Sequence, residues 1–128
     1  MDGEETFDLV LFFAALADRT RLRLLNLMRK GEVCVCFFAD ALGTNNPKIS
    51  RHLAYLRRAG LVRTRRQGKW MHYSLNRPTD GHASAIFESI LKSFDYDPEM
   101  ISDVGAMLNI CCALDDALIS VGGSRTSG

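Results

Sequence analysis

The chain has 128 residues, of which 47% are hydrophobic and 24% are charged, a composition typical of one globular domain. No apolar run approaches the roughly 18 residues of a membrane-spanning helix, and the acidic start argues against a secretory signal peptide. The net charge of +1 excludes a chain that is strongly basic or acidic throughout. Four cysteines are too few for a disulfide scaffold, so we expect reduced thiols in a cytoplasmic protein without a membrane partner.

The charges are distributed unevenly along the chain. Residues 1–40 carry −2, residues 41–79 carry +9 without a single carboxylate, and residues 80–128 carry −6. A basic window of this kind inside a nearly neutral protein is typical of a face that binds a polyanion. Charge alone also allows a solvated basic surface without any partner.

The first half of the chain is predicted to be helical. Residues 5–17 form an apolar helix with hydrophobic residues on more than one stripe, and a partner subunit is one way to cover the second face. Asp18 can cap a helix over 19–30, and a short helix follows over 36–42. The core face of the helix over 19–30 consists of Leu22, Leu25 and Met28.

The turn over 43–47 leads into a basic amphipathic helix over 47–59. Thr44, Asn45 or Asn46 can cap this helix, and Pro47 suits its first turn. Its inward face consists of Ile49, Leu53 and Leu56, which are spaced by four and three residues. A different face carries Lys48, Arg51, His52 and Tyr55, to which Ser50 and Asn46 can add short hydrogen bonds.

The segments 61–66 and 70–75 are rich in residues that favour strands, and Gln67-Gly68-Lys69 joins them into a predicted hairpin. Its tip carries Arg65, Arg66 and Lys69, whereas Trp70 is expected to pack at the hairpin base. Helices are predicted over 84–94 and 98–119, the second with an apolar stripe. We predict one domain over residues 1–120 and a disordered tail over 121–128.

This order of elements predicts a mainly α fold with a β-hairpin wing, the winged helix-turn-helix. A helix of about 13 residues fits the major groove of B-DNA, so we expect double-stranded DNA as the partner. The candidate DNA-binding residues are Asn46, Lys48, Ser50, Arg51, His52, Tyr55, Arg65, Arg66 and Lys69. No phosphate-binding loop, nucleophile motif or apolar carboxylate pair suggests an enzyme.

Four segments resemble the ArsR/SmtB family of metalloregulatory repressors, of the arsenic- and antimony-responsive ArsR type. Residues 14–25 resemble the family's ALADPTRLRIL opening, with Arg19 in place of the common Pro, and residues 32–36 resemble its ELCVC metal-binding box. Residues 48–62 are similar to its recognition helix and residues 67–75 to its wing. The resemblance implies a homodimer, joined through the N- and C-terminal helices, that represses transcription and leaves its operator when an inducer binds. It implies no cofactor for DNA binding itself.

Thiolates are soft ligands suited to trivalent arsenic and antimony, which favour three sulfurs. Cys34 and Cys36 lie in the box, but Ala39 stands where arsenic repressors with this box carry a third Cys. Cys111 and Cys112 form a vicinal pair of the kind that binds arsenite or antimonite in some relatives, with a third thiolate from elsewhere. Cys34 and Cys36 alone could bind a methylated arsenite, or they can be small buried residues; Cys111 can instead pack on the dimer stripe with Met107 and Leu114.

The family's zinc, nickel and cobalt site needs histidines on the C-terminal helix, and the segment over 98–119 contains none. Binding of As(III) or Sb(III) is therefore the main hypothesis, with a coupling that weakens operator binding by about 5- to 150-fold. The alternatives are a Cd/Pb-responsive or thiol-redox-responsive repressor and, outside regulation, a thiol protein that binds or stores metal.

Overall fold

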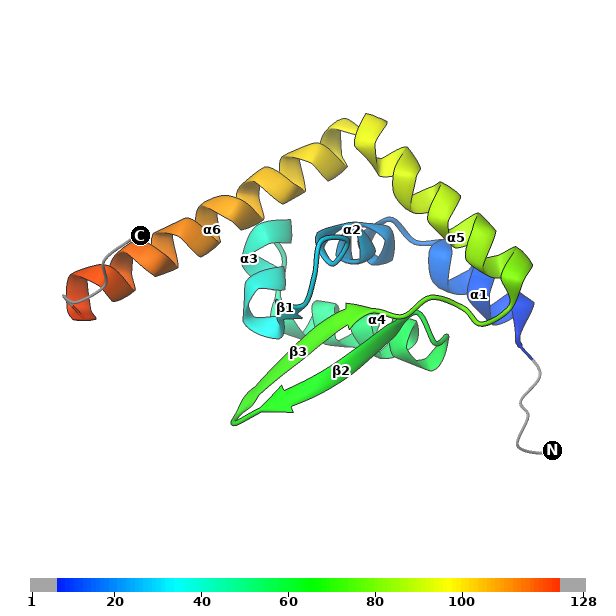
Figure 1. The fold of residues 1–128 in the computed structure, drawn as a ribbon, viewed down its shortest axis with the longest axis horizontal. Helices are drawn as coiled ribbons and strands as arrows, with labels where there is room; N and C mark the ends of the chain where they lie inside the picture. The colour runs from blue at the N-terminus through cyan, green and yellow to red at the C-terminus, as the bar shows by residue number, and fades with distance from the viewer. Residues whose placement is uncertain (1–6, 123–128) are drawn as a thin grey trace.

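The computed structural model describes the backbone of residues 7–122 and the side chains of residues 7–110. Within this range, helices and one small sheet form a winged helix-turn-helix (Figure 1). The elements are α1 (Leu9–Leu16), α2 (Arg19–Leu27), β1 (Val33–Cys34), η1 (Val35–Phe37), α3 (Phe38–Leu42), α4 (Asn46–Arg58), β2 (Val62–Gln67), β3 (Trp70–Leu75), α5 (Gly81–Ser93), η2 (Phe94–Tyr96) and α6 (Pro98–Gly122). The predicted fold class is confirmed, and no described helix is long and apolar enough to cross a membrane.

Short polar side chains set the helix starts. Asp18 Oδ1 accepts a hydrogen bond from the backbone N–H of Arg21 at 3.0 Å, which confirms the predicted cap of α2. Of the three cap candidates before α4, Asn45 is the one used: its Oδ1 accepts from Lys48 N–H at 2.9 Å. Gly43, with φ 67°, ends α3 in the left-handed conformation that the tight turn of the motif requires.

The sheet has three antiparallel strands in the order β1-β3-β2. The hairpin of β2 and β3 is confirmed, but Gln67 pairs with Trp70, so the turn consists of Gly68 and Lys69 alone. Strand β1 is an addition that the sequence did not predict, because two residues are too short to show an alternating pattern. It places Cys34 opposite His72 of β3.

One core holds these elements together. The predicted inward face of α4 is confirmed, since Ile49, Leu53 and Leu56 are at most 1% exposed. In α2, Leu25 is buried as expected, Leu22 is half-buried, and Leu24 is buried as well; Met28, the residue that caps the end of α2, is also buried as expected. The largest core side chains include Phe12, Phe38 and Phe87, one from each of three helices.

The long helix α6 lies across α2 and α3 and then reaches beyond the rest of the fold (Figure 1). Its N-terminal half is fastened to α2 by ion pairs. Arg19 contacts Glu99 at 2.7 Å and Asp97 at 2.8 Å, and Arg23 contacts Asp103 at 2.7 Å. Arg19 therefore has a structural role at the position where the family commonly carries Pro.

Candidate nucleic-acid interface and thiol site

Helix α4 presents a polar, basic surface opposite its buried face. Asn46, Lys48, Ser50 and Arg51 are all exposed, and within the described residues no carboxylate lies within ion-pair distance of Lys48 or Arg51. The cap at Asn45 fixes the first turn, so these side chains start from a rigid end of the helix. They are placed to meet the edge of a nucleic-acid groove.

His52 and Tyr55, also predicted to contact DNA, lie against α2 instead of pointing freely outward. His52 Nδ1 is 3.2 Å from a guanidinium nitrogen of Arg21 and 3.8 Å from Asp18 Oδ1. Burial, with the nearby arginines, lowers the pKa of His52 below its ordinary value. The guanidinium groups of Arg21 and Arg58 lie over the Tyr55 ring, at 4.1 Å and 4.7 Å from its centroid. Both side chains support the packing of α4 on α2.

The wing carries the remaining predicted DNA contacts. Arg66 and Lys69 are exposed, and Lys69 Nζ lies 5.4 Å from the centroid of the Trp70 ring. Trp70 is 47% exposed beside the turn, so the expectation that it packs at the hairpin base is wrong. Arg65 is not free: it holds both carboxylate oxygens of Glu32, at 2.7 and 2.9 Å.

Cys34 and Cys36 are brought together at the end of β1 and in η1. The Cys36 thiol donates to Cys34 Sγ across 3.2 Å, a separation short enough for one atom to bridge both sulfurs. Burial and the neighbouring Cys34 raise the pKa of Cys36 to about 11, so this group is a neutral thiol at physiological pH. Ala39, at the position of the missing third Cys, is buried.

The second predicted pair lies on α6, but the side chains of Cys111 and Cys112 are outside the described residues. Among the side chains of residues 7–110, no group of three His, Cys, Asp or Glu converges to hold a metal ion. The described part of the thiol site therefore supplies two sulfur ligands.

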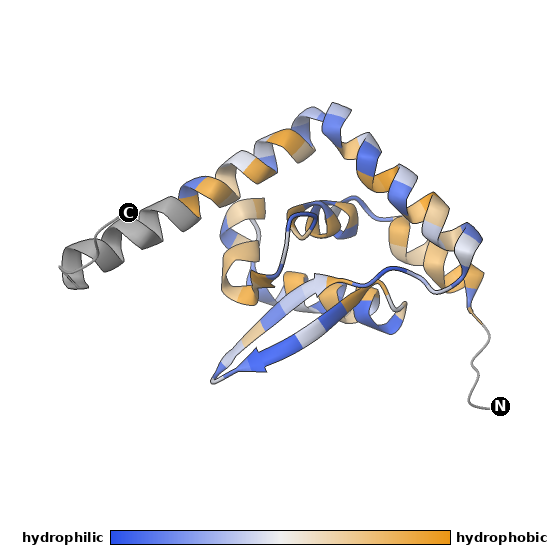
Figure 2. Cartoon of the chain, in the orientation of Figure 1, coloured by the Kyte–Doolittle hydropathy of each residue, from blue (hydrophilic) through white to orange (hydrophobic). Residues whose placement is uncertain are grey.

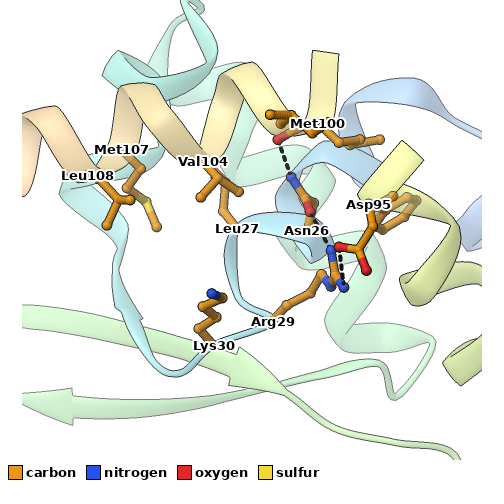
Figure 3. Close-up of a pocket in the computed structure, with 11 residues that line it drawn as sticks. Asn26, Leu27, Arg29, Lys30, Asp95, Met100, Val104, Met107 and Leu108 are labelled. Atoms are coloured by element: carbon orange, nitrogen blue, oxygen red, sulfur yellow. Dashed lines mark hydrogen bonds and ion pairs between the residues drawn. The ribbon is translucent and has the colours of Figure 1, made fainter. Parts of the chain in front are cut away.

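A separate cavity of about 400 Å³ opens between the end of α2 and the start of α6 (Figure 3). Leu27, Val104 and Met107 line it, and the Lys30 side chain is directed toward Met107 and Leu108 (Figure 3). Among the side chains of residues 7–110, none of the predicted DNA or thiol residues lines this cavity.

Known proteins resemble this chain over the region that contains the helix-turn-helix. A family model described as "Bacterial regulatory protein, arsR family" matches residues 18–64. The chain is 46% identical over 80 residues to the arsenical resistance operon repressor of Escherichia coli K12, covering 62% of this chain and 68% of that protein. It is 43% identical over 82 residues to the arsenic resistance transcriptional regulator ArsR1 of Pseudomonas putida KT2440, covering 63% and 64%.

Solved structures show the same fold. The structure of HlyU from Vibrio cholerae N16961 matches with a TM-score of 0.57 and 30% identity, covering 66% of this chain and 88% of that one.

Proposed function

The chain belongs to the arsR family of bacterial regulatory proteins, and from that premise we propose that it is a repressor released from its operator by trivalent arsenic or antimony. As a member of this family it is a DNA-binding transcriptional regulator and not an enzyme. The observation that carries the inducer proposal is the position of Cys34, on a strand that is hydrogen-bonded directly to the wing. A ligand on this residue acts on an element that approaches DNA.

The DNA interface in this proposal combines the exposed side chains of α4 with the tip of the wing. Lys48, Ser50 and Arg51 would enter the major groove with Asn46 at the helix start, while Arg66 and Lys69 would contact phosphates. His52 and Tyr55 would set the angle of α4 against α2, because both contact Arg21. Clustered cations without carboxylates nearby should make binding strongly dependent on salt.

A homodimer would present two such interfaces to an inverted repeat. Support comes from one end of the molecule, where α1 and α5 lie and are largely hydrophobic (Figure 2). Leu9 is 49% exposed, Val10 78% and Phe13 46%, and Ile86 of α5 is exposed too. The two helices pack together through Phe12 and Phe87, so their uncovered residues can form one continuous interface.

The chemistry of the thiols favours a trivalent metalloid. Neutral As(OH)3 reacts with two thiols by forming two As–S bonds and breaking two As–O bonds, and the thiol protons leave with the hydroxides as two waters. No oxidant is needed, and no proton is released to solvent. Cys34 and Cys36 would supply two sulfurs, and Cys111 or Cys112 the third that As(III) and Sb(III) favour. A methylated arsenite, which carries one carbon substituent, would need only the first two.

The test begins with DNA selected by the purified protein from a random duplex pool. We expect an inverted repeat, bound less tightly by about 5- to 150-fold when arsenite or antimonite is added. Zn(II) should have little effect, and the same response to Cd(II) alone would favour the cadmium-type alternative. Cys34→Ser/Cys36→Ser and Cys111→Ser/Cys112→Ser variants identify the thiols that carry the response.

Two arginine variants test the interface separately. Arg51→Ala should reduce discrimination between the selected repeat and other sequences, because this residue is placed to read bases. Arg66→Ala should weaken binding to all sequences alike and reduce the salt dependence, because it is placed to contact phosphate. Sequence-independent binding by the wild type, or no response to any metalloid, would refute the proposal, and peroxide-driven release would support the redox alternative.

A further inference from the structure

The ion pair between Glu32 and Arg65 has no role in DNA binding as described above. Glu32 lies directly before β1, and its carboxylate reaches past β3 to the guanidinium of Arg65 in β2. The contact is bidentate, a geometry that holds two planar groups in a fixed orientation. The Glu32 carboxylate therefore neutralises an arginine of the wing. A surface that served only to bind DNA would leave this arginine free to contact phosphate.

The strand register explains what this contact joins. Cys34 lies opposite His72, and His72 lies opposite Arg65, so the three residues form one row across the sheet. Directly opposite residues in antiparallel strands share a face, and residues two apart in one strand share it as well. Glu32, Cys34 and Arg65 are therefore placed on the same face of the sheet.

Strand β1 has few other attachments to the wing. Its pairing with β3 involves only Val33 with Tyr73 and Cys34 with His72. The Glu32 carboxylate adds a third link, and hydrogen bonding to Arg65 holds its pKa below the ordinary value, so it stays ionised at neutral pH. This link is the one that reaches β2, the strand that carries Arg66.

We propose that Glu32 is a positioning residue that ties the cysteine-bearing strand β1 to the wing through Arg65, so that a ligand bridging Cys34 and Cys36 displaces the wing. The inference rests on the proposed thiol-dependent release from DNA. It identifies the contact through which ligand binding at the thiols would reach the wing. When one atom bridges the two sulfurs, it closes a ring over residues 34–36 and so ties the end of β1 to η1. The ion pair joins the residue before β1 directly to β2, whereas the backbone pairing of β1 reaches β2 only through β3.

The experiment uses the full chain with Cys111→Ser and Cys112→Ser, which leaves Cys34 and Cys36 as its only thiols. Phenylarsine oxide is the probe, because its arsenic forms two As–S bonds with two thiols and releases its oxygen with both protons as water. Glu32→Gln removes the charge at constant size. Glu99→Gln is the matched control, since Glu99 also pairs with an arginine, Arg19, but far from the wing.

Two measurements are made on each protein. The first is the affinity for the selected repeat with and without the probe. We expect the fold-loss in affinity caused by the probe to be at least threefold smaller in Glu32→Gln and unchanged in Glu99→Gln. The exchange Glu32→Arg with Arg65→Glu, which restores the pair, should recover more than half of the loss. The second is amide hydrogen exchange over residues 70–75 without any probe, which should be at least threefold faster in Glu32→Gln alone.

Equal responses of Glu32→Gln and Glu99→Gln to the probe, or unchanged exchange over residues 70–75, would overturn the role of Glu32. Failure of the proposed function is distinguishable, because it appears as wild-type protein that does not respond to arsenite or antimonite. In that case the exchange measurement, which involves neither metalloid nor DNA, still decides whether Glu32 holds β1 to the wing. Surface ion pairs add little to global stability, so both variants should remain folded.

Discussion

At the residue scale, the state of Cys36 decides which ligands the thiol site can take. Its pKa of about 11 means that the thiol is protonated throughout the physiological range, because burial and Cys34 both disfavour the thiolate. A divalent cation that binds this sulfur must expel its proton into solvent, and the cost of doing so falls as pH rises. Trivalent arsenic instead brings a hydroxide that leaves with the proton as water.

The two ligand classes should therefore differ in pH dependence. In the Cys111→Ser/Cys112→Ser background, we expect the apparent affinity for Cd(II) to rise by at least about 10-fold per pH unit between pH 6.5 and 8, since one or more protons leave on binding. The apparent affinity for phenylarsine oxide should stay within about threefold over the same range. The measurement is the ligand concentration that half-releases the protein from the selected repeat at each pH.

The Cys34→Ser/Cys36→Ser variant is the control for this comparison, and its affinity for the selected repeat is measured at each pH. Any pH dependence that remains without these two thiols belongs to DNA binding itself. A Cd(II) affinity that does not change with pH would mean that Cys36 is already a thiolate. That result would contradict the protonated state described here.

At the element scale, α6 is attached to the DNA-binding domain by buried polar contacts in addition to its apolar residues Met100, Val104 and Met107. Asp103 is 4% exposed and pairs with Arg23, while Asn26 Nδ2 donates to the backbone oxygen of Met100 at 2.9 Å. On the same helix Ile101 is 57% exposed and Leu108 60%. The attachment of α6 therefore depends on a few buried polar groups whose loss is costly.

Removing one partner of the buried pair should loosen α6. Asp103→Ala leaves the mostly buried Arg23 guanidinium with only its longer contact to Glu99, at 3.6 Å, and we expect a loss of about 2–4 kcal/mol in the free energy of unfolding. Asp95→Ala is the control, because Asp95 also pairs with an arginine of this region, Arg29, but its side chain is 61% exposed. Urea denaturation followed by circular dichroism measures both.

The control should unfold within error of the wild type, because exposed ion pairs contribute little. Similar losses of unfolding free energy in the two variants would show that the negative charge of these residues stabilises the fold whether or not the ion pair is buried. No loss in Asp103→Ala would mean that α6 is held mainly by its apolar contacts with α3.

At the scale of the whole molecule, opposite ends have opposite character. Exposed cations gather on α4 and the wing. Helices α1 and α5, which Figure 2 colours largely hydrophobic, expose Leu9, Val10, Phe13 and Ile86, while α6 exposes Ile101 and Leu108. Two basic surfaces of identical subunits repel each other, whereas exposed apolar surfaces gain free energy when they are buried against each other. This separation favours a dimer joined at the apolar end with both DNA-binding surfaces left open.

The dimer proposal is tested by a charge on the apolar end. Val10 is 78% exposed, so Val10→Glu should leave the folded subunit intact but place a carboxylate in the interface, converting the dimer to a monomer. Tyr96→Glu, at a residue that is 87% exposed near the start of α6, is the matched control and should remain dimeric. Sedimentation velocity at micromolar concentration measures both.

If Val10→Glu sediments as a dimer, the subunits associate through another surface. If the wild type is monomeric while it binds the selected repeat, a homodimer is not required for that binding. Either result would refute the interface proposed for α1 and α5.

The sequence by itself determined the order of the main helices and the hairpin, but not strand β1. Periodic apolar residues such as Ile49, Leu53 and Leu56 and short polar caps such as Asp18 act through local geometry, so each identifies its helix without knowledge of the rest of the chain. The same local information located the hairpin and the basic window. It also supported the family resemblance, which the comparisons confirm.

Only the tertiary structure decided which groups meet. The pairing of β1 with β3 and of Glu32 with Arg65 joins segments more than 30 positions apart, and no local pattern encodes such a contact. The same holds for His52, which the helical spacing alone placed on the basic face but the packing of α4 on α2 turned toward Arg21. Spacing fixes the direction in which a side chain leaves its helix, whereas the neighbours that it then contacts depend on how distant elements pack.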